Sequence, residues 1–165
     1  MAELTLAAMV ERGLARAVAG DASVRVSGIR HDSRAVEPGD MFAAIAGVRH
    51  GKEFAPEAVR RGAVAVLSDH PFACDVPVLL CDDTLVALAA IARALYDDPT
   101  AGLTAVGVTG TNGKTTTAYL IEAVIAAAGK QPAVIGTVSF RAGGKVRAAT
   151  HTTPMADDMM RLARW

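Results

Sequence analysis

The residues from Gly110 to Thr116 have the types and spacing of a phosphate-binding turn. Two glycines let backbone N–H groups converge on phosphate oxygens, and the start of a following helix adds positive potential. Lys114 would reach the β- and γ-phosphates of a nucleotide, and the Thr115 hydroxyl would ligate Mg²⁺. The expected nucleotide-binding residues are Gly110, Thr111, Asn112, Gly113, Lys114, Thr115 and Thr116.

Val108 separates this turn from two standard phosphate-binding motifs. It stands where a dinucleotide-binding Gly-x-Gly-x-x-Gly turn and a strict P-loop both require their first glycine. What remains is the second half of a P-loop, and its strand-turn-helix context favours phosphate binding over a solvated lysine in a glycine loop. The sequence has no Asn-Lys-x-Asp motif, which disfavours a GTPase. No acidic residue ends the next apolar strand, so these residues supply half of a phosphoryl-transfer site.

The elements around the turn predict a βαβ unit. Ala105–Val108 is apolar enough for a buried parallel strand, and the segment PAVIG predicts the next strand after a right-handed crossover. Gly143–Gly144 predicts a hairpin turn. Between the two strands lies a helix that Gly129 closes, with an inner stripe of Leu120, Ile121, Val124, Ile125 and Ala128.

The first hundred residues alternate short apolar runs with turns, which predicts an α/β domain. Strands are expected before the polar loop HDSR, after the turn Pro38–Gly39, at Ala63–Leu67 and at PVLL. A short helix precedes its C-cap Gly62. The helical spacing in Thr84–Tyr96 follows a cap at Asp82 or Asp83, and Pro99 ends that helix and marks a domain boundary. At the N-terminus an amphipathic helix is expected, with a stripe of Leu6, Val10, Leu14 and Val18.

Composition favours a cytoplasmic globular protein. The 165 residues carry a formal net charge of zero and 4% aromatic residues, which excludes a basic or stacking surface for nucleic acid. No segment has the length of a membrane span or the basic start of a signal peptide. Cys74 and Cys81 are expected to be buried, reduced thiols. The four histidines have no metal-ligand spacing.

Three segments resemble the Mur ligase family and cover almost the whole chain. GVTGTNGKTTTAYLIEA is similar to its variant P-loop, which has valine at this position. IGTVSF followed by THTTP is similar to the segment after the first crossover, and HDSRAVEPGDMFAAIAG to the uridine-binding region. The resemblance implies a small α/β uridine-binding domain at residues 1–99. The start of a P-loop α/β domain with a parallel sheet would follow at residues 100–165.

The same resemblance implies substrate contacts. Ser33, with His31 beside it, would contact the UDP moiety, and a loop one residue shorter than usual would border the nucleotide with Val48, Arg49 and His50. The sugar-peptide would be held near the γ-phosphate by His151, Thr152 and Thr153. Three structural alternatives stay open: an Asx or ST turn at Asp32–Ser33, a solvated Arg49, and an extended segment before a helix at Thr152–Pro154.

The closest members of the family add the third amino acid, meso-diaminopimelate or L-lysine, to UDP-N-acetylmuramoyl-L-alanyl-D-glutamate in peptidoglycan synthesis. This implies ATP-dependent amide formation through an acyl phosphate, with ATP and Mg²⁺ as cofactors and Lys114 and Thr115 as catalytic residues. The partners are small molecules, without nucleic acid or membrane insertion. Because further strands, magnesium ligands and the amino-acid-selecting domain of such an enzyme would follow Trp165, we expect these residues to be part of a longer enzyme or a truncated product, inactive alone.

Three other functions stay open. A related Mur-type ligase would add a different residue. A non-catalytic UDP-sugar-binding module with a residual P-loop would bind uridine nucleotides alone. A regulatory nucleotide switch would bind adenine or guanine nucleotides alone, whereas the ligase would bind both uridine and adenine nucleotides.

Overall fold

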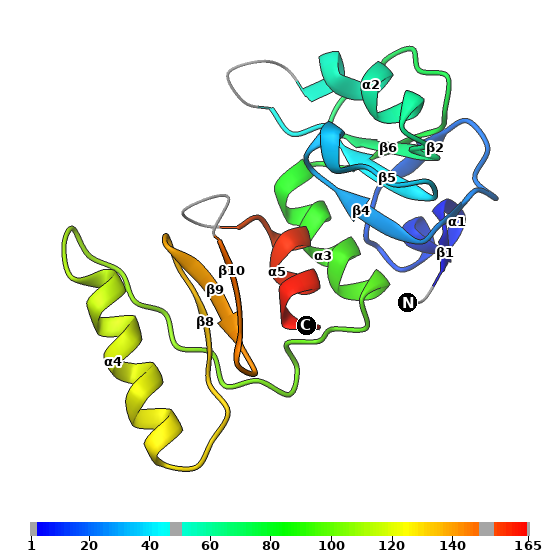
Figure 1. Ribbon diagram of the computed structural model, residues 1–165. Coiled ribbons are helices and arrows are strands. Elements are labelled where there is room, and N and C mark those ends of the chain that lie inside the picture. Colours follow the sequence, from blue (N-terminus) through cyan, green and yellow to red (C-terminus); the bar gives the residue numbers. More distant parts are fainter. Residues whose placement is uncertain (1–2, 47–50, 149–153, 165) are drawn as a thin grey trace. The chain divides into compact units, whose positions relative to one another are not determined.

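The computed structural model describes residues 3–46, 51–148 and 154–164 (Figure 1). These residues form two compact units. The first unit contains the described residues up to Ala101 together with Met155–Arg164, and the second contains those from Gly102 to Pro154. Within the described ranges no helix combines the length and the apolar character that crossing a membrane requires.

A five-stranded sheet of order β2-β7-β6-β5-β4 forms the centre of the first unit. The four strands from β4 to β7 are parallel, and β2 pairs antiparallel with β7. The strands are β2 (Ala17–Ala19), β4 (Gly28–Arg30), β5 (Asp40–Ala43), β6 (Ala65–Ser68) and β7 (Val78–Leu80). A two-stranded ladder joins β1 (Leu4–Thr5) to β3 (Arg25–Val26). The predicted α/β fold is confirmed, and the parallel strands lie in this unit, whereas the parallel sheet was expected at residues 100–165.

Helices cover both faces of this sheet. They are α1 (Leu6–Glu11), α2 (Ala55–Arg60), α3 (Thr84–Leu95) and α5 (Ala156–Ala163), with short 3₁₀ turns η1 (Ser33–Ala35) and η2 (Gly51–Phe54). Successive side chains of a strand point to opposite faces, so Met41 and Ala43 join one buried cluster with α1 and α3, while Phe42 joins the other with α2. Burial on both faces explains the apolar runs Met41–Ala43 in β5 and Ala65–Leu67 in β6.

Asp83 begins helix α3. Its Oδ1 accepts hydrogen bonds from the backbone N–H groups of Leu85, at 2.8 Å, and Val86, at 3.0 Å. These donors have no partner within a helix, so the carboxylate satisfies groups that would otherwise need water. Of the two caps expected from the sequence, the structure selects Asp83.

Asp83→Ala is expected to lower the free energy of unfolding of the first unit by about 1 kcal/mol, because two amide donors lose their acceptor. Urea denaturation followed by circular dichroism would measure the change. Asp82→Ala is the matched control. Its ion pair with Arg16 spans 3.5 Å between exposed side chains, so the control is expected to change stability by less than about 0.5 kcal/mol. Equal effects of the two substitutions would contradict the capping role.

The N-terminal helix is shorter than its sequence pattern predicts. Helix α1 ends at Glu11, so it contains only Leu6 and Val10 of the predicted stripe. Gly13, with φ of 69°, follows the helix in the left-handed conformation that ends many helices. Val18 lies instead in β2, where it pairs with Leu79. The expected burial of both cysteines is also corrected: Cys81 is buried, and Cys74 is only half-buried, both as free thiols.

The second unit contains helix α4 (Lys114–Ala127) and a three-stranded antiparallel sheet of order β10-β9-β8. Its strands are β8 (Ala133–Ile135), β9 (Ser139–Ala142) and β10 (Lys145–Ala148). Gly143 and Gly144, at φ of 54° and 78°, form the turn between β9 and β10. The predicted hairpin is therefore confirmed.

The predicted strand at Ala105–Val108 is wrong. Those residues form no strand and Val106 is 61% exposed, while β8 pairs antiparallel with β9. A parallel strand here requires a distant ladder partner, whereas β8, β9 and β10 pair through short connections with little loop-closure entropy. The right-handed βαβ unit expected around the turn is thus not formed by the described residues.

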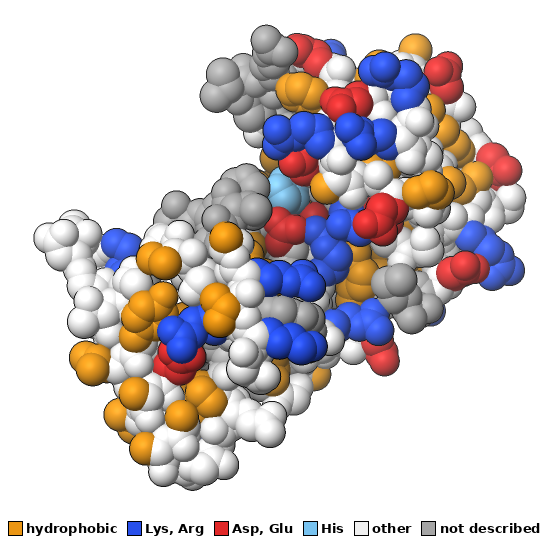
Figure 2. All heavy atoms as spheres, viewed as in Figure 1, with side chains coloured by type: hydrophobic (Ala, Val, Ile, Leu, Met, Phe, Trp, Pro, Cys, Tyr) orange, Lys and Arg blue, Asp and Glu red, His pale blue; other side chains and the backbone are white. Residues whose placement is uncertain are grey.

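The predicted inner stripe of helix α4 is not buried. None of its fourteen residues is buried, and Leu120 and Val124 are 63% and 69% exposed. Figure 2 shows apolar side chains spread over the surface of this unit. Three short strands are too narrow to cover the helix fully, so Ile121 and Ile125 are half-buried while Leu120 and Val124 face solvent among the described residues.

Candidate functional site

The glycine turn leads directly into the first turn of helix α4. Gly113 precedes the helix at φ of 77°, a left-handed conformation that favours glycine. Lys114 folds back over the turn, and its Nζ donates to the Gly110 carbonyl at 2.6 Å and the Thr111 carbonyl at 3.4 Å. The first helical turn contains no acidic side chain. A lysine ammonium and a helix N-terminus therefore meet at one turn, an arrangement that attracts phosphate.

Two hydroxyls meet beside this turn. Thr115 Oγ1 lies 3.3 Å from Thr137 Oγ1, which follows strand β8. Hard oxygen donors of this kind suit Mg²⁺, so Thr115 fits its expected role as a ligand. Between residues 102 and 154 the sequence has one carboxylate, Glu122, and it pairs with Arg141 at 3.2 Å. This segment thus offers Mg²⁺ hydroxyl oxygens, and its one carboxylate is already paired with an arginine.

The loop with Ser33 lies at the carboxyl end of strand β4. Strands β4 and β5 are parallel neighbours, so the loops that follow them emerge at the same edge of the sheet. Ligands of open α/β sheets bind at this edge. Ser33 therefore lies at the edge of the sheet where open α/β folds bind ligands.

Ser33 and Asp32 both have partners in this loop. Ser33 is 6% exposed, and its Oγ donates to Glu57 Oε2 of helix α2 at 3.0 Å. Asp32 accepts from the backbone N–H of Arg34 at 3.0 Å and pairs with the guanidinium of the same residue, which lowers the pKa of Asp32. Asp32 therefore makes the Asx turn considered from the sequence, and this turn orients η1.

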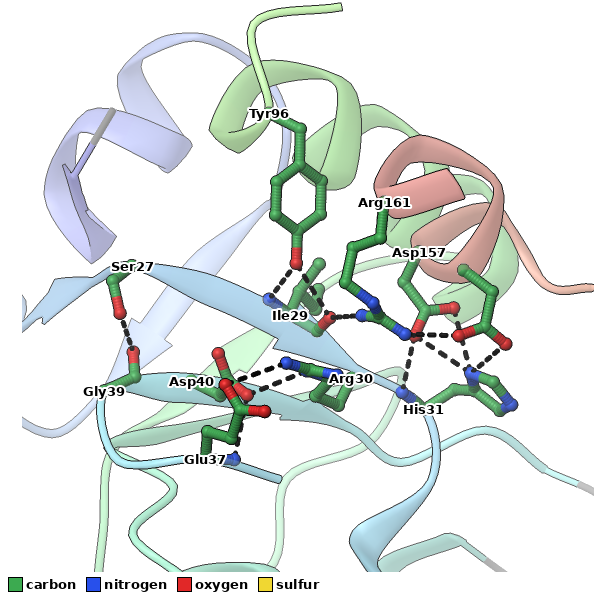
Figure 3. A network of polar contacts seen from close by, with 11 residues as sticks. Ser27, Ile29, Arg30, His31, Glu37, Gly39, Asp40, Tyr96, Asp157 and Arg161 are labelled. Atoms are coloured by element: carbon green, nitrogen blue, oxygen red, sulfur yellow. Dashed lines mark hydrogen bonds and ion pairs between the residues drawn. The ribbon is translucent and has the colours of Figure 1, made fainter. Parts of the chain in front are cut away.

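His31 contacts helix α5, which comes from the other end of the chain (Figure 3). Its backbone N–H donates to Asp157 Oδ2 at 3.2 Å, and its Nδ1 lies 2.9 Å from Asp157 Oδ1. Asp157 is fully buried. The hydrogen bond to Asp157 raises the pKa of His31 despite partial burial. Burial favours the neutral form of Asp157, but the bond and charge of His31 and the charge of Arg161 outweigh it, so the pKa of Asp157 is lowered.

His31, Asp157 and Asp158 also have a spacing that suits a metal ion, with ligand atoms within 4.8 Å of one another. Their hydrogen bonds point to another arrangement. The Nδ1 of His31 is engaged by Asp157, and the guanidinium of Arg161 pairs with both carboxylates. A guanidinium beside both ligating carboxylates repels a cation, so these groups form a salt-bridge network.

Several expected substrate-binding residues lie outside the residues that the structure describes: Val48, Arg49, His50, His151, Thr152 and Thr153. Their contacts stay predictions. Sequence reasoning missed Glu57, Thr137, Asp157 and Arg161 as neighbours of the candidate residues. Asp157 lies 126 positions from His31, and no local pattern signals such a pair. The one relevant signal is the pair of acidic residues after Pro154. Such a pair indicates the first turn of a helix, but it does not indicate which residue the helix contacts.

Comparison with known proteins identifies the family of both units. The model described as "Mur ligase family, catalytic domain" matches residues 25–99, and "Mur ligase middle domain" matches residues 108–162. The UDP-N-acetylmuramoyl-L-alanyl-D-glutamate–2,6-diaminopimelate ligase of Streptomyces coelicolor is 43% identical over 150 residues, covering 87% of this chain and 29% of that protein. Its namesake from Geobacillus thermodenitrificans is 46% identical over 124 residues, covering 74% and 25%. The chain thus spans less than a third of the length of these relatives.

Solved structures show the same fold. A UDP-N-acetylmuramoyl-L-alanyl-D-glutamate–2,6-diaminopimelate ligase superposes with a TM-score of 0.70 at 24% identity, covering 98% of this chain and 33% of that one. MurF from Acinetobacter baumannii superposes with a TM-score of 0.60 at 23% identity, covering 77% and 28%. The fold, the variant P-loop and the matched models agree with the resemblance found in the sequence motifs. This chain belongs to the Mur ligase family.

Proposed function

We propose that this chain forms the UDP-substrate-binding domain, at residues 1–99, and the start of the nucleotide-binding domain, at residues 100–165, of an ATP-dependent ligase. The reaction joins 2,6-diaminopimelate to UDP-N-acetylmuramoyl-L-alanyl-D-glutamate in peptidoglycan synthesis, in the cytoplasm. The observation that carries the proposal is the 43% identity to relatives of that name, which extends through both units. Those names also favour diaminopimelate over L-lysine.

The residues of the glycine turn would bind the nucleotide. Gly110–Thr116 would present backbone N–H groups to the phosphates, Lys114 would move from the Gly110 carbonyl to the phosphates, and Thr115 would hold Mg²⁺. Bound Mg²⁺–ATP supplies phosphoryl transfer to a carboxylate, which activates it for attack by an amine. The contribution of the chain is positioning and charge neutralisation.

The residues at the carboxyl edge of the first sheet would bind the UDP moiety. Ser33 and His31 are the described candidates, and the buried Oγ of Ser33, held by Glu57, supports a fixed hydroxyl at this edge. The substrate roles of residues 48–50 and 151–153 are part of the same proposal and rest on the family resemblance.

Ser33→Ala is expected to weaken binding of UDP-N-acetylmuramoyl-L-alanyl-D-glutamate to the 165-residue chain by about tenfold, because the Ser33 oxygen, whose proton goes to Glu57, would no longer accept a hydrogen bond from the ligand. Calorimetric titration of the wild-type chain and the variant measures this. Ser23→Ala, at an exposed position of the same unit, is the matched control and should bind as the wild type does. Circular dichroism would verify that both variants are folded.

The same titration with uridine and adenine nucleotides separates the proposal from its alternatives. Binding of both supports the ligase. Binding of uridine nucleotides alone would favour a UDP-sugar-binding module, and binding of adenine nucleotides alone would favour a nucleotide switch. A folded wild-type chain that binds no UDP substrate would contradict the proposed site.

A further inference from the structure

Helix α5 holds the strand-to-loop junction of the candidate substrate site by two residues one helical turn apart (Figure 3). Asp157 accepts from the backbone N–H and the imidazole of His31, at 3.2 Å and 2.9 Å. Arg161 donates to the Ile29 carbonyl at 3.1 Å. The helix therefore fixes the backbone on both sides of Arg30, where strand β4 ends and the loop begins.

The environment of this contact makes it strong. Asp157 is fully buried, and the side chains of His31 and Arg161 are 18% and 24% exposed. A buried carboxylate requires partners for its oxygens, and Asp157 receives them from His31 and Arg161. Replacing the carboxylate by an amide leaves one uncharged acceptor oxygen where two charged ones serve the His31 N–H, the imidazole and the guanidinium, so His31 would be held less firmly in one orientation.

We propose that Asp157 is a positioning residue for the loop that contains His31 and Ser33. It orients the His31 side chain directly, and it orients Ser33 through the His31 backbone. The inference rests on the proposed function, which places UDP at this loop. Asp157 itself touches no substrate. It acts on affinity because a loop already held in its binding conformation loses less conformational entropy when the ligand binds.

This role makes substrate affinity depend on pH. Among the described residues, the carboxylates that raise the pKa of His31 are Asp157 and Asp158 of helix α5 and Asp32 of its own loop. Protonated His31 stabilises the contact, and this contribution is lost as pH rises through the raised pKa of His31. The contribution of ionised Asp157 is lost as pH falls through its own lowered pKa. Affinity is therefore expected to be highest between these two values and to fall on the alkaline side.

Asp157→Asn in the 165-residue chain tests the proposal, with Asp158→Asn as the matched control. Both substitutions remove one carboxylate from the first turn of the same helix, so they change its dipole interaction alike. Asp157→Asn is expected to weaken binding of UDP-N-acetylmuramoyl-L-alanyl-D-glutamate by about tenfold, and Asp158→Asn by less than about threefold. NMR titration of the His31 imidazole should show a pKa nearer its ordinary value in Asp157→Asn, with a flatter pH profile of affinity.

The outcomes separate the two proposals. If the wild-type chain binds the substrate and a folded Asp157→Asn variant binds equally well, the positioning role is overturned and the proposed function is not. If the folded wild-type chain binds no substrate, both are overturned. Should Asp157→Asn unfold, Arg161→Met decides, because it removes the bond of helix α5 to the Ile29 carbonyl and leaves His31 in place. Weaker substrate binding by a folded Arg161→Met variant supports the role, and unchanged binding contradicts it.

Discussion

Replacement of Lys114 by methionine is expected to weaken ATP binding by the 165-residue chain by about a hundredfold. The ammonium lies over the glycine turn, 2.6 Å from the Gly110 carbonyl. There it would donate charge-assisted hydrogen bonds to two phosphates, each contributing about 1.5 kcal/mol or more, and about 1.4 kcal/mol corresponds to a tenfold change in affinity. Methionine is unbranched like lysine, one heavy atom shorter, and has a similar helix propensity, so helix α4 should persist.

Titration with ATP in the presence of Mg²⁺ would measure the effect, and Lys130→Met is the control. Lys130 lies beyond the opposite end of α4 and is exposed, so its loss changes the net charge equally without touching the turn. A hundredfold loss in Lys114→Met with an unchanged Lys130→Met supports the phosphate-binding role. Equal losses would indicate only a general effect of charge, and an unchanged Lys114→Met would refute that role.

Phe42→Ala is expected to lower the free energy of unfolding of the first unit by about 3–5 kcal/mol. Phe42 is 2% exposed in strand β5, between two parallel neighbours, and packs in the cluster that contains Ala55, Ala58 and Val66. Those neighbours are small or lie in rigid strands, so they cannot close the cavity that the ring would leave. The loss therefore includes both the transfer free energy of the ring and a cavity term.

Urea denaturation followed by circular dichroism measures this change, with Phe54→Ala as the control. Phe54 precedes helix α2 and is 36% exposed, so the same substitution there removes less buried surface and should cost less than about 1.5 kcal/mol. If Phe42→Ala were as stable as Phe54→Ala, this face of the sheet would have to be loosely packed, which would contradict the close packing seen around Phe42.

The elements predicted correctly from the sequence are those with local signals. Helix α3 combines a capping aspartate with helical spacing that buries Leu88, Ala92 and Leu95, and the hairpin has two glycines at its turn. Strands β5 and β6 are apolar runs closed by turns, as expected of parallel strands buried on both faces.

The failures share a dependence on distant partners. Ala105–Val108 has the composition of a buried strand, but a strand forms only beside a ladder partner, and β8 pairs with β9 instead. In the candidate sites, the type and spacing of Lys114, Thr115 and Ser33 could be read locally. The bond from Ser33 to Glu57 and that from His31 to Asp157 depend on how the chain folds back, which no spacing in the sequence encodes.

Helix α4 buries none of its residues although it follows directly on the glycine turn. A helix with so few buried residues is expected to unfold locally at low free energy. The closed state, with the glycine turn and the first turn of α4 formed, would then coexist with locally open states. The apparent dissociation constant of a ligand that requires the closed turn equals its intrinsic value divided by the closed fraction. Any element that covers Leu120 and Val124 would increase that fraction. Under the proposed function, nucleotide affinity would therefore depend in part on an apolar surface that contacts no phosphate.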